Sequence, residues 1–196
     1  MANKIKEIKA KSLCYGITNK TNDGLYCLFG DYDKVYFHVL LKELDDLIKK
    51  YPDKLTNFAI FETRESVLTK KGAFGSYHVV NFAKHSYFNM REILAHLSVD
   101  PDFYNLPANT PYRANTLRVS PKFSVDAENV ILTPAPKFIC FYPTEKKIEP
   151  KKKMVSSGIL RAYELLLNMP KFKLSWLRKE DDLTGVQIKK YYSASD

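Results

Sequence analysis

The alternation of hydrophobic and polar residues along this chain changes period several times, and each change predicts a different secondary-structure element. Residues 12–17 and 25–29 are apolar runs of strand length, and the turn-forming residues 19–24 between them predict a hairpin connection. Over residues 35–51 the apolar side chains recur every three or four positions, with charged side chains on the opposite side. This spacing predicts an amphipathic helix that ends at Pro52.

After Pro52 the pattern predicts more strands than helices. Residues 55–63 and 76–82 have strand character, and a loop that contains lysine and glycine joins them. Asn89 is a candidate N-cap for a second helix, which runs to about Leu97. Three further strands are expected, at residues 115–120, 129–133 and 137–142.

The order of these elements predicts the fold class. From residue 25 the order is strand, helix, strand, strand, helix, strand, which builds an antiparallel sheet with two helices on one face. We therefore expect an α+β domain over residues 1–144, in the ferredoxin-like or RNA-recognition-motif (βαββαβ) arrangement with one additional N-terminal strand. Residues 145–196 are expected to form a basic linker and a small helical appendage, with Ser156 or Ser157 as the N-cap.

Composition excludes several classes of protein. The 196 residues are 45% hydrophobic and 13% aromatic, which suffices for one packed core. No apolar run is long enough to cross a membrane, and the lysine-rich residues 1–11 lack the apolar segment of a signal peptide. We therefore expect a soluble, cytoplasmic protein that is not secreted. Cys14, Cys27 and Cys140 are far apart in apolar runs, which favours core thiols in a reducing compartment over a disulfide or zinc site.

Positive charge is concentrated at the two ends of the chain. Of the net charge of +9, residues 1–11 contribute +3, residues 145–196 contribute +5 and residues 12–144 contribute +1. Lysine runs of this kind are usually solvated linkers. A basic periphery around a nearly neutral centre also suits a polyanion that is held at the edges.

Two aspartates follow the predicted strand at residues 25–29. Asp31 and Asp33 are two positions apart, so in an extended segment their side chains point to the same face. Two carboxylates this close repel each other, and a divalent cation between them removes the repulsion. The alternative is an ordinary strand-to-helix turn in which Asp33 acts as an N-cap.

A serine and a histidine form a second polar pair, on the predicted strand at residues 76–82. Ser76 and His78 are also two positions apart and follow a glycine-containing loop. In the βαββαβ arrangement the first and third strands are the inner two, so this pair and the two aspartates are expected to be neighbours. A histidine on a strand is more often a structural residue, and that alternative stays open.

Together the two pairs resemble the catalytic core of the archaeo-eukaryotic primase superfamily, which includes the primase-polymerases of plasmids and viruses. The resemblance covers about residues 25–125 and rests on hydrophobic-Asp-x-Asp at Asp31 and Asp33, and on small-x-His at Ser76 and His78. It implies metal-dependent nucleotidyl transfer with Mg²⁺ or Mn²⁺, for which Asp31 and Asp33 are the metal ligands. It also implies that Ser76 and His78 belong to the nucleotide site, with His78 at the triphosphate.

The third acidic residue of that family is not evident in this chain. The strand expected at residues 115–120 carries no carboxylate, so another acid is needed as a metal ligand. Arg118 and Lys122 instead suit contacts to the phosphates of a nucleotide or template, and a salt bridge is the alternative role of Arg118. The candidates for the third metal ligand are Asp126, Glu128 and Asp100.

The resulting expectation is a primase-polymerase-like protein of DNA replication. Its expected partners are a nucleoside triphosphate and a DNA or RNA strand, a single-stranded template first of all, and no membrane. Cores of this size often work beside a helicase, which is a further candidate partner. Three other functions stay open: a non-catalytic single-strand-binding protein of the same fold, an accessory subunit whose basic tail docks an acidic partner, and a rolling-circle endonuclease. The last requires a His-hydrophobic-His pair, which the sequence lacks.

Overall fold

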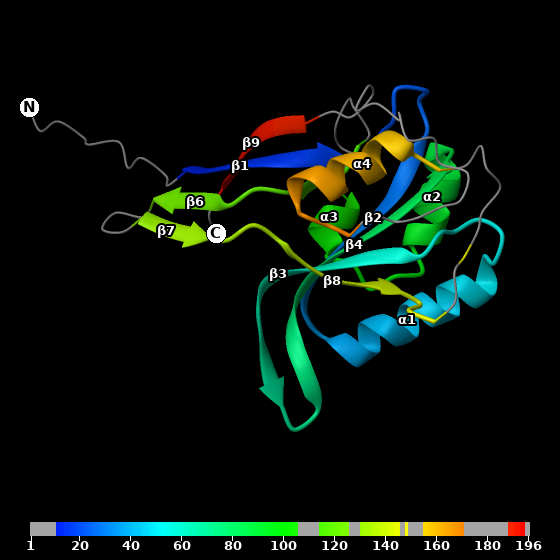
Figure 1. Cartoon of the computed structure of the whole chain (residues 1–196), viewed down its shortest axis with the longest axis horizontal. Helices are drawn as coiled ribbons and strands as arrows, with labels where there is room; N and C mark the ends of the chain where they lie inside the picture. The colour runs from blue at the N-terminus through cyan, green and yellow to red at the C-terminus, as the bar shows by residue number, and fades with distance from the viewer. Residues whose placement is uncertain are drawn as a thin grey trace, which may run out of the picture.

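The protein consists of two antiparallel sheets and their covering helices, as a computed structural model shows (Figure 1). The structure describes residues 11–105, 114–125, 130–145, 148, 155–170 and 188–194. The first sheet contains β1 (Lys11–Thr18), β5 (Thr116–Arg118), β6 (Lys122–Val125), β7 (Val130–Thr133) and β9 (Ile188–Ala194). The second contains β2 (Tyr26–Tyr36), β3 (Phe58–Thr69), β4 (Gly72–His85) and β8 (Lys137–Tyr142). The helices are α1 (Phe37–Lys50), α2 (Tyr87–Leu94), α3 (Pro101–Asn105) and α4 (Ser157–Leu166).

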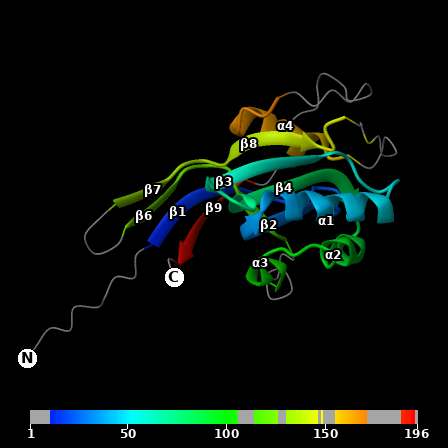
Figure 2. The ribbon, with the colours of Figure 1, turned by 90° about the horizontal axis from the view of Figure 1, so that it is seen from below.

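The second sheet has helices on both of its faces. Its strand order is β2–β4–β3–β8, and all neighbouring strands are antiparallel. The helices α1 and α2 lie on one face and α4 lies on the other (Figure 2). The fold therefore belongs to the α+β class, as the element order predicts. The prediction that helices cover only one face of the sheet is wrong, because α4 covers the other face.

Alternate residues of the central strands enter two separate cores. In β4, Tyr77 and Val79 pack on the side of α1 and α2, whereas Val80 and Phe82 pack on the side of α4. The ring of Tyr163 on α4 lies between 5.2 and 6.1 Å from the rings of Phe29, Phe61 and Phe82. Because both faces are covered here, the segment Phe58–Phe61 of β3 is apolar at every position.

The pairing of β2 with β4 brings the two predicted polar pairs together. Asp31 is the direct cross-strand partner of His78, so the prediction that these residues are neighbours is confirmed. Because β2 continues to Tyr36, Asp31 and Asp33 lie within a strand and not at a strand-to-helix turn.

The helix α1 begins at Phe37, two residues later than the spacing predicts. The residue at its N-cap position is Tyr36, so the alternative role of Asp33 as an N-cap is wrong. The cause is an irregularity at Lys34, whose φ of +54° accompanies a shift of the β2–β4 register. This bulge carries β2 past the aspartates before the helix starts.

The strand expected at residues 115–120 belongs to the first sheet, where β5 pairs with β1 and not with β2. Loops occupy the outer edge of β2 instead. The Cys27 N–H donates to the Asn19 carbonyl at 2.8 Å, and the Asp100 N–H donates to the Asp31 carbonyl at 2.8 Å. At the opposite edge of the sheet β8 pairs with β3. The sheet therefore has β2 at one edge, where the expected order has an inner strand.

The described C-terminal elements belong to the same packed body as the rest of the chain, and not to an appendage. The apolar face of α4 places Ile159, Leu160 and Tyr163 in the core of the second sheet, and β9 pairs with β1. Ser156 caps α4 as expected, with its Oγ accepting the Ile159 N–H at 3.3 Å. The lysines of the predicted linker lie outside the described residues.

The loop expected between the strands at 55–63 and 76–82 is a projecting β-hairpin. The strands β3 and β4 remain paired as far as Thr69 and Gly72, and Figure 1 shows this hairpin extending beyond the sheet. The φ of Gly72 is +113°, a conformation that glycine adopts without strain at the turn.

The helix α2 starts three residues earlier than expected. Its N-cap is Ser86, whose Oγ accepts the Asn89 N–H at 3.3 Å. Asn89 therefore lies inside the helix, where its own N–H is the donor that Ser86 satisfies.

The structure gives the state of the three cysteines and the lengths of the described helices. Cys14 and Cys27 are buried and Cys140 is half-buried, and none of the three forms a disulfide within the described residues. Among the helices of the described ranges, none is both long enough and apolar enough to cross a membrane.

Candidate functional site

A pocket of about 270 Å³ is lined by residues of both sheets, and we call it the site pocket. The second sheet contributes Asp31, Asp33, Thr63, Arg64 and His78. The first sheet and its connections contribute Cys14, Thr116, Arg118, Lys122 and Thr133. The site pocket thus brings together five residues that the sequence nominated, namely Asp31, Asp33, His78, Arg118 and Lys122.

The carboxyl of Asp31 in the site pocket has a strongly raised pKa. Burial, together with the nearby charges of Asp33 and Asp100, raises the pKa of its carboxyl to about 7. Arg118 and Arg64 act in the opposite direction but do not cancel this effect. A carboxylate that is difficult to ionise in this position is stabilised by any cation that enters the pocket.

His78 lies against Asp31 and carries no charge at neutral pH. Its side chain is 8% exposed, and burial, with a smaller contribution from Arg118, lowers its pKa to about 3. The distance of 3.6 Å between His78 Nε2 and Asp31 Oδ1 is longer than a hydrogen bond. Since the imidazole is neutral, this contact is not an ion pair. Within the described residues Nδ1 of His78 is buried without a hydrogen-bond partner, which is unusual for a buried ring nitrogen.

Arg118 joins the walls of the site pocket. Its side chain donates from Nη1 to the carbonyls of Ser120 and Pro134, at 2.8 and 2.5 Å, and from Nη2 to the carbonyl of Thr63, at 3.2 Å. These acceptors belong to the segment after β5, the connection before β8, and β3. The sequence predicts a phosphate contact or a salt bridge for Arg118. The observed bonds give it a structural role at the pocket wall in addition to its charge.

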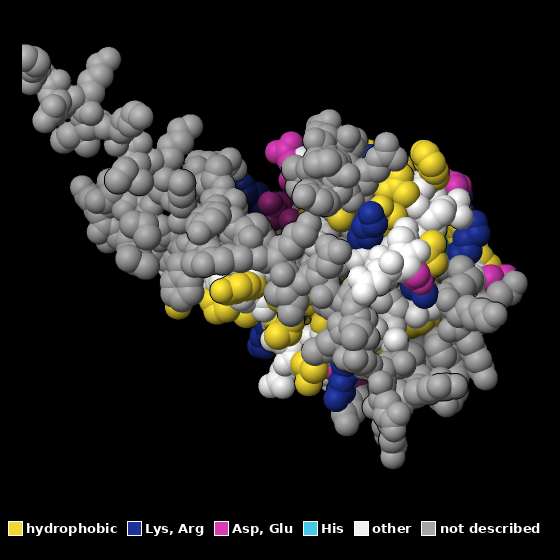
Figure 3. Space-filling model, turned by 90° about the horizontal axis from the view of Figure 1, so that it is seen from above, with side chains coloured by type: hydrophobic (Ala, Val, Ile, Leu, Met, Phe, Trp, Pro, Cys, Tyr) yellow, Lys and Arg dark blue, Asp and Glu magenta, His cyan; other side chains and the backbone are white. Residues whose placement is uncertain are grey.

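Two more cations line the site pocket. The sequence analysis predicts Lys122 as a site residue. It does not predict Arg64, because nothing in the local pattern distinguishes Arg64 from other residues of the expected loop. Arg64 is exposed and Lys122 is half-buried. On the face shown in Figure 3 the described lysine and arginine side chains lie scattered among apolar and acidic ones. The site pocket combines three basic side chains, those of Arg64, Arg118 and Lys122, with the two carboxylates of Asp31 and Asp33.

Of the predicted site residues that the structure describes, Ser76 and Asp100 are not among those that line the site pocket. Ser76 is buried, and its Oγ accepts the Lys34 N–H at 3.4 Å beside the bulge in β2. This bond points to a structural role in the β2–β4 pairing. Asp126, like Glu128, lies outside the described residues.

Asp100 is the described candidate for a third acid. Its charge contributes to the raised pKa of Asp31. However, its Oδ1 accepts the N–H groups of Asp102 and Phe103, at 2.8 and 3.0 Å, so the carboxylate caps the start of α3. Asp100 therefore acts on Asp31 through its charge and is not a lining residue of the site pocket.

The two carboxylates of the site pocket match a metal site in which water and substrate phosphates supply the remaining ligands. Across the described ranges no group of three or more His, Cys, Asp or Glu side chains has a metal-binding arrangement. A cage made entirely of protein ligands therefore has no support there. Mg²⁺ is commonly held by one or two carboxylates, with water and substrate phosphates as the other ligands, and Asp31 with Asp33 fits that pattern.

Comparisons of the chain with protein-family models, with curated proteins and with solved structures found no match. What the site pocket can do chemically thus follows from its own residues. Two carboxylates, a neutral histidine and three cations suit a ligand that combines phosphate groups with a divalent cation.

Proposed function

We propose that the protein is a metal-dependent nucleotidyltransferase of DNA replication, similar to a primase-polymerase, and that the site pocket takes the triphosphate of a nucleotide. The observation that carries this proposal is the pairing of Asp31 with His78 on adjacent strands, inside a pocket that also holds Asp33 and basic residues. The element order β2–α1–β3–β4–α2 also supports it, because it matches the first five elements of the RNA-recognition-motif arrangement.

Asp31 and Asp33 would hold Mg²⁺ or Mn²⁺. Burial and the repulsion from Asp33 and Asp100 raise the pKa of Asp31, and Nδ1 of His78 has no hydrogen-bond partner among the described residues; both fit a pocket that takes a charged ligand. When bound, the cation would activate the attacking 3′-hydroxyl and stabilise the leaving pyrophosphate.

The remaining residues of the site pocket would bind and orient the triphosphate. Lys122 and Arg64 offer positive charge to the phosphate oxygens. His78 stays neutral because it is buried, so it can donate a ring N–H to a phosphate oxygen without adding charge. Arg118 keeps the pocket walls in place through its carbonyl bonds.

Nucleotide incorporation on primed and unprimed templates, with Mg²⁺ or Mn²⁺, tests this proposal. Asp31→Asn and Asp33→Asn should each lower the rate of incorporation by about a hundredfold or more, because each replaces a charged ligand of the metal ion by a neutral amide. Asp46→Asn, which changes an exposed carboxylate on α1, is the matched control and should leave the rate unchanged. Absence of incorporation by the wild-type protein with both metals rejects the enzyme.

A non-catalytic single-strand-binding protein is the second candidate. It is favoured by the basic ends of the chain and by the observation that, among the described residues lining the site pocket, Asp31 and Asp33 are the acids. Under this function, affinity for single strands falls steeply with salt, and replacing the lysines at residues 151–153 by glutamine flattens that dependence. Such substitutions are preferable to deletion of the C-terminal segment, because α4 and β9 pack into the body of the protein.

A further inference from the structure

A second pocket lies at the foot of the β3–β4 hairpin, on the opposite face of the same strands. Its volume is about 400 Å³, and we call it the hairpin pocket. It is lined by Tyr77 and Glu62, whereas the site pocket is lined by the next residues along each strand, His78 and Thr63. Because successive side chains of a strand point to opposite faces, the two pockets lie back to back.

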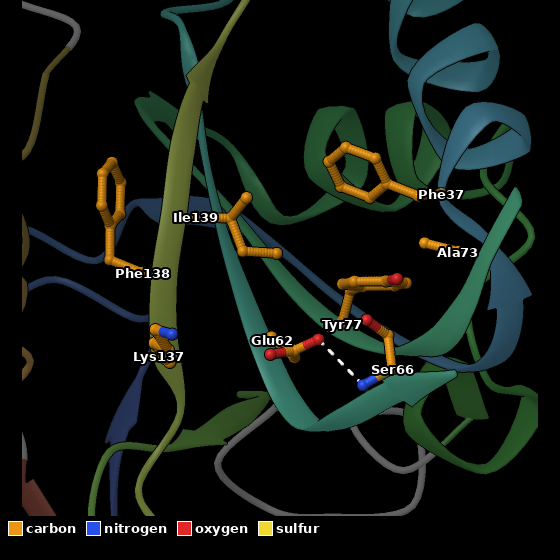
Figure 4. A pocket seen from close by; sticks show the side chains of 8 residues that line it. All are labelled: Phe37, Glu62, Ser66, Ala73, Tyr77, Lys137, Phe138 and Ile139. Atoms are coloured by element: carbon orange, nitrogen blue, oxygen red, sulfur yellow. Dashed lines mark hydrogen bonds between the residues drawn. The ribbon is translucent and has the colours of Figure 1, made fainter. Parts of the chain in front are cut away.

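The apolar part of the hairpin pocket contains two aromatic rings and an aliphatic side chain. The rings of Phe37 on α1 and Tyr77 on β4 are 5.3 Å apart with an angle of 48° between them (Figure 4). Ile139 points toward them from β8, and it is 40% exposed. A shift of register between β3 and β8 leaves Ile139 without a cross-strand partner, and this bulge directs its side chain to the pocket.

The polar part of the hairpin pocket holds one carboxylate and one ammonium group. Glu62 Oε1 accepts the Ser66 N–H at 3.0 Å, which holds the carboxylate at the pocket floor (Figure 4). Lys137 is the cross-strand neighbour of Glu62, on the exposed side of β8. In the part of the chain that the structure describes, the two charged groups do not form an ion pair, so each is available to a ligand.

We infer that the hairpin pocket binds a nucleotide whose base carries an exocyclic amino group. The base would lie against Phe37, Tyr77 and Ile139, and its amino group would donate to Glu62. The attached phosphate would meet Lys137. An apolar protein side chain would contact the rings but make no polar contact with Glu62 or Lys137, and the net charge of +9 also favours a phosphate-bearing ligand. The inference does not rest on the proposed function, since it needs no metal and no residue of the site pocket.

This arrangement predicts selectivity among bases. Cytosine, adenine and guanine have an exocyclic amino group, whereas uracil offers one N–H between two carbonyl groups that the carboxylate of Glu62 repels. A hydrogen bond to a charged group changes affinity by about tenfold or more. Cytidine monophosphate should therefore bind at least about tenfold more tightly than uridine monophosphate.

Calorimetric titration of the full chain with these two mononucleotides, in the presence of EDTA, tests the inference. In Glu62→Gln the preference for cytosine should disappear, because the glutamine amide both donates and accepts. Glu65→Gln, an exposed carboxylate on the hairpin, is the matched control and should keep the preference. Lys137→Gln should weaken both mononucleotides by about threefold, the value of an exposed ion pair, and Lys71→Gln should weaken neither.

Short oligocytidylate and oligouridylate identify the source of the base. Selective binding of the mononucleotide assigns the pocket to a free nucleotide, and selectivity seen only with oligonucleotides assigns it to an unpaired base within a strand. Equal binding of cytosine and uracil by both probes, no binding of either, or full selectivity in Glu62→Gln overturns the inference. Because no metal is present, none of these results depends on whether the protein incorporates nucleotides.

Discussion

Replacing Asp31 by asparagine should stabilise the protein at about pH 8, although Asp31 is the central acid of the proposed site. In the folded protein the pKa of Asp31 is about 7, compared with 3.8 for the ordinary carboxyl group. Between these values the folded state binds more protons than the unfolded state, so the stability contributed at this site falls as the pH rises. Above about pH 7 the whole penalty is present in the wild type, and the neutral amide of Asp31→Asn avoids it.

The size of this effect follows from the pKa difference. A difference of about three units corresponds to about 4 kcal/mol, at about 1.4 kcal/mol for each unit. The side chain of Asp31 is 31% exposed, so water reduces part of the burial penalty and screens part of the repulsion. We therefore expect Asp31→Asn to raise the free energy of unfolding by about 2 kcal/mol at about pH 8 and by less than about 0.5 kcal/mol at about pH 4.

Urea unfolding of both proteins at the two pH values measures this effect. With a denaturant slope of about 2 kcal/mol/M, the transition midpoint of Asp31→Asn should lie about 1 M higher than that of the wild type at about pH 8. Asp46→Asn is the control and should shift the midpoint by less than about 0.3 M at either pH. The reasoning is refuted when Asp31→Asn is no more stable than the wild type at about pH 8, or when its advantage is the same at both pH values.

Three further predictions concern other parts of the structure. Arg118→Met should lower the free energy of unfolding by about 3 kcal/mol in urea titrations, because it leaves the buried carbonyl of Thr63 without its donor, whereas Arg64→Met at the exposed rim should cost less than about 1 kcal/mol. Burial lowers the pKa of His85 from 6.5 to about 4. As the pH falls from about 7 to about 4, His85 is protonated in the unfolded state first, so the free energy of unfolding of the wild type should fall by about 3 kcal/mol relative to that of His85→Gln. Ser86→Ala should cost about 1 kcal/mol in thermal unfolding, through loss of the cap of α2; an unchanged midpoint counts against that cap.

The elements whose pattern is local were predictable from the sequence. The helix α1 shows the three-and-four spacing of one buried face, with Leu40, Leu44 and Leu47 all buried in the structure. The adjacency of Asp31 and His78 was predicted from the strand order of the βαββαβ arrangement, whereas the register that places them directly opposite each other was not. The start of α1 was not, because the bulge at Lys34 depends on pairing with β4 and not on propensity.

The sequence by itself determined the α+β class, the amphipathic helix α1 and the two polar pairs, because each depends on residues a few positions apart. Only the tertiary structure decided that β5 pairs with β1, that α4 covers the second face of the sheet, and that Arg64 and Arg118 reach the site pocket. The hairpin pocket likewise exists only where α1, β3, β4 and β8 meet. Hydrophobic periodicity reports which side of a segment is buried, but not which distant segment buries it. That choice depends on the packing of the whole chain, and the composition of both pockets depends on that choice.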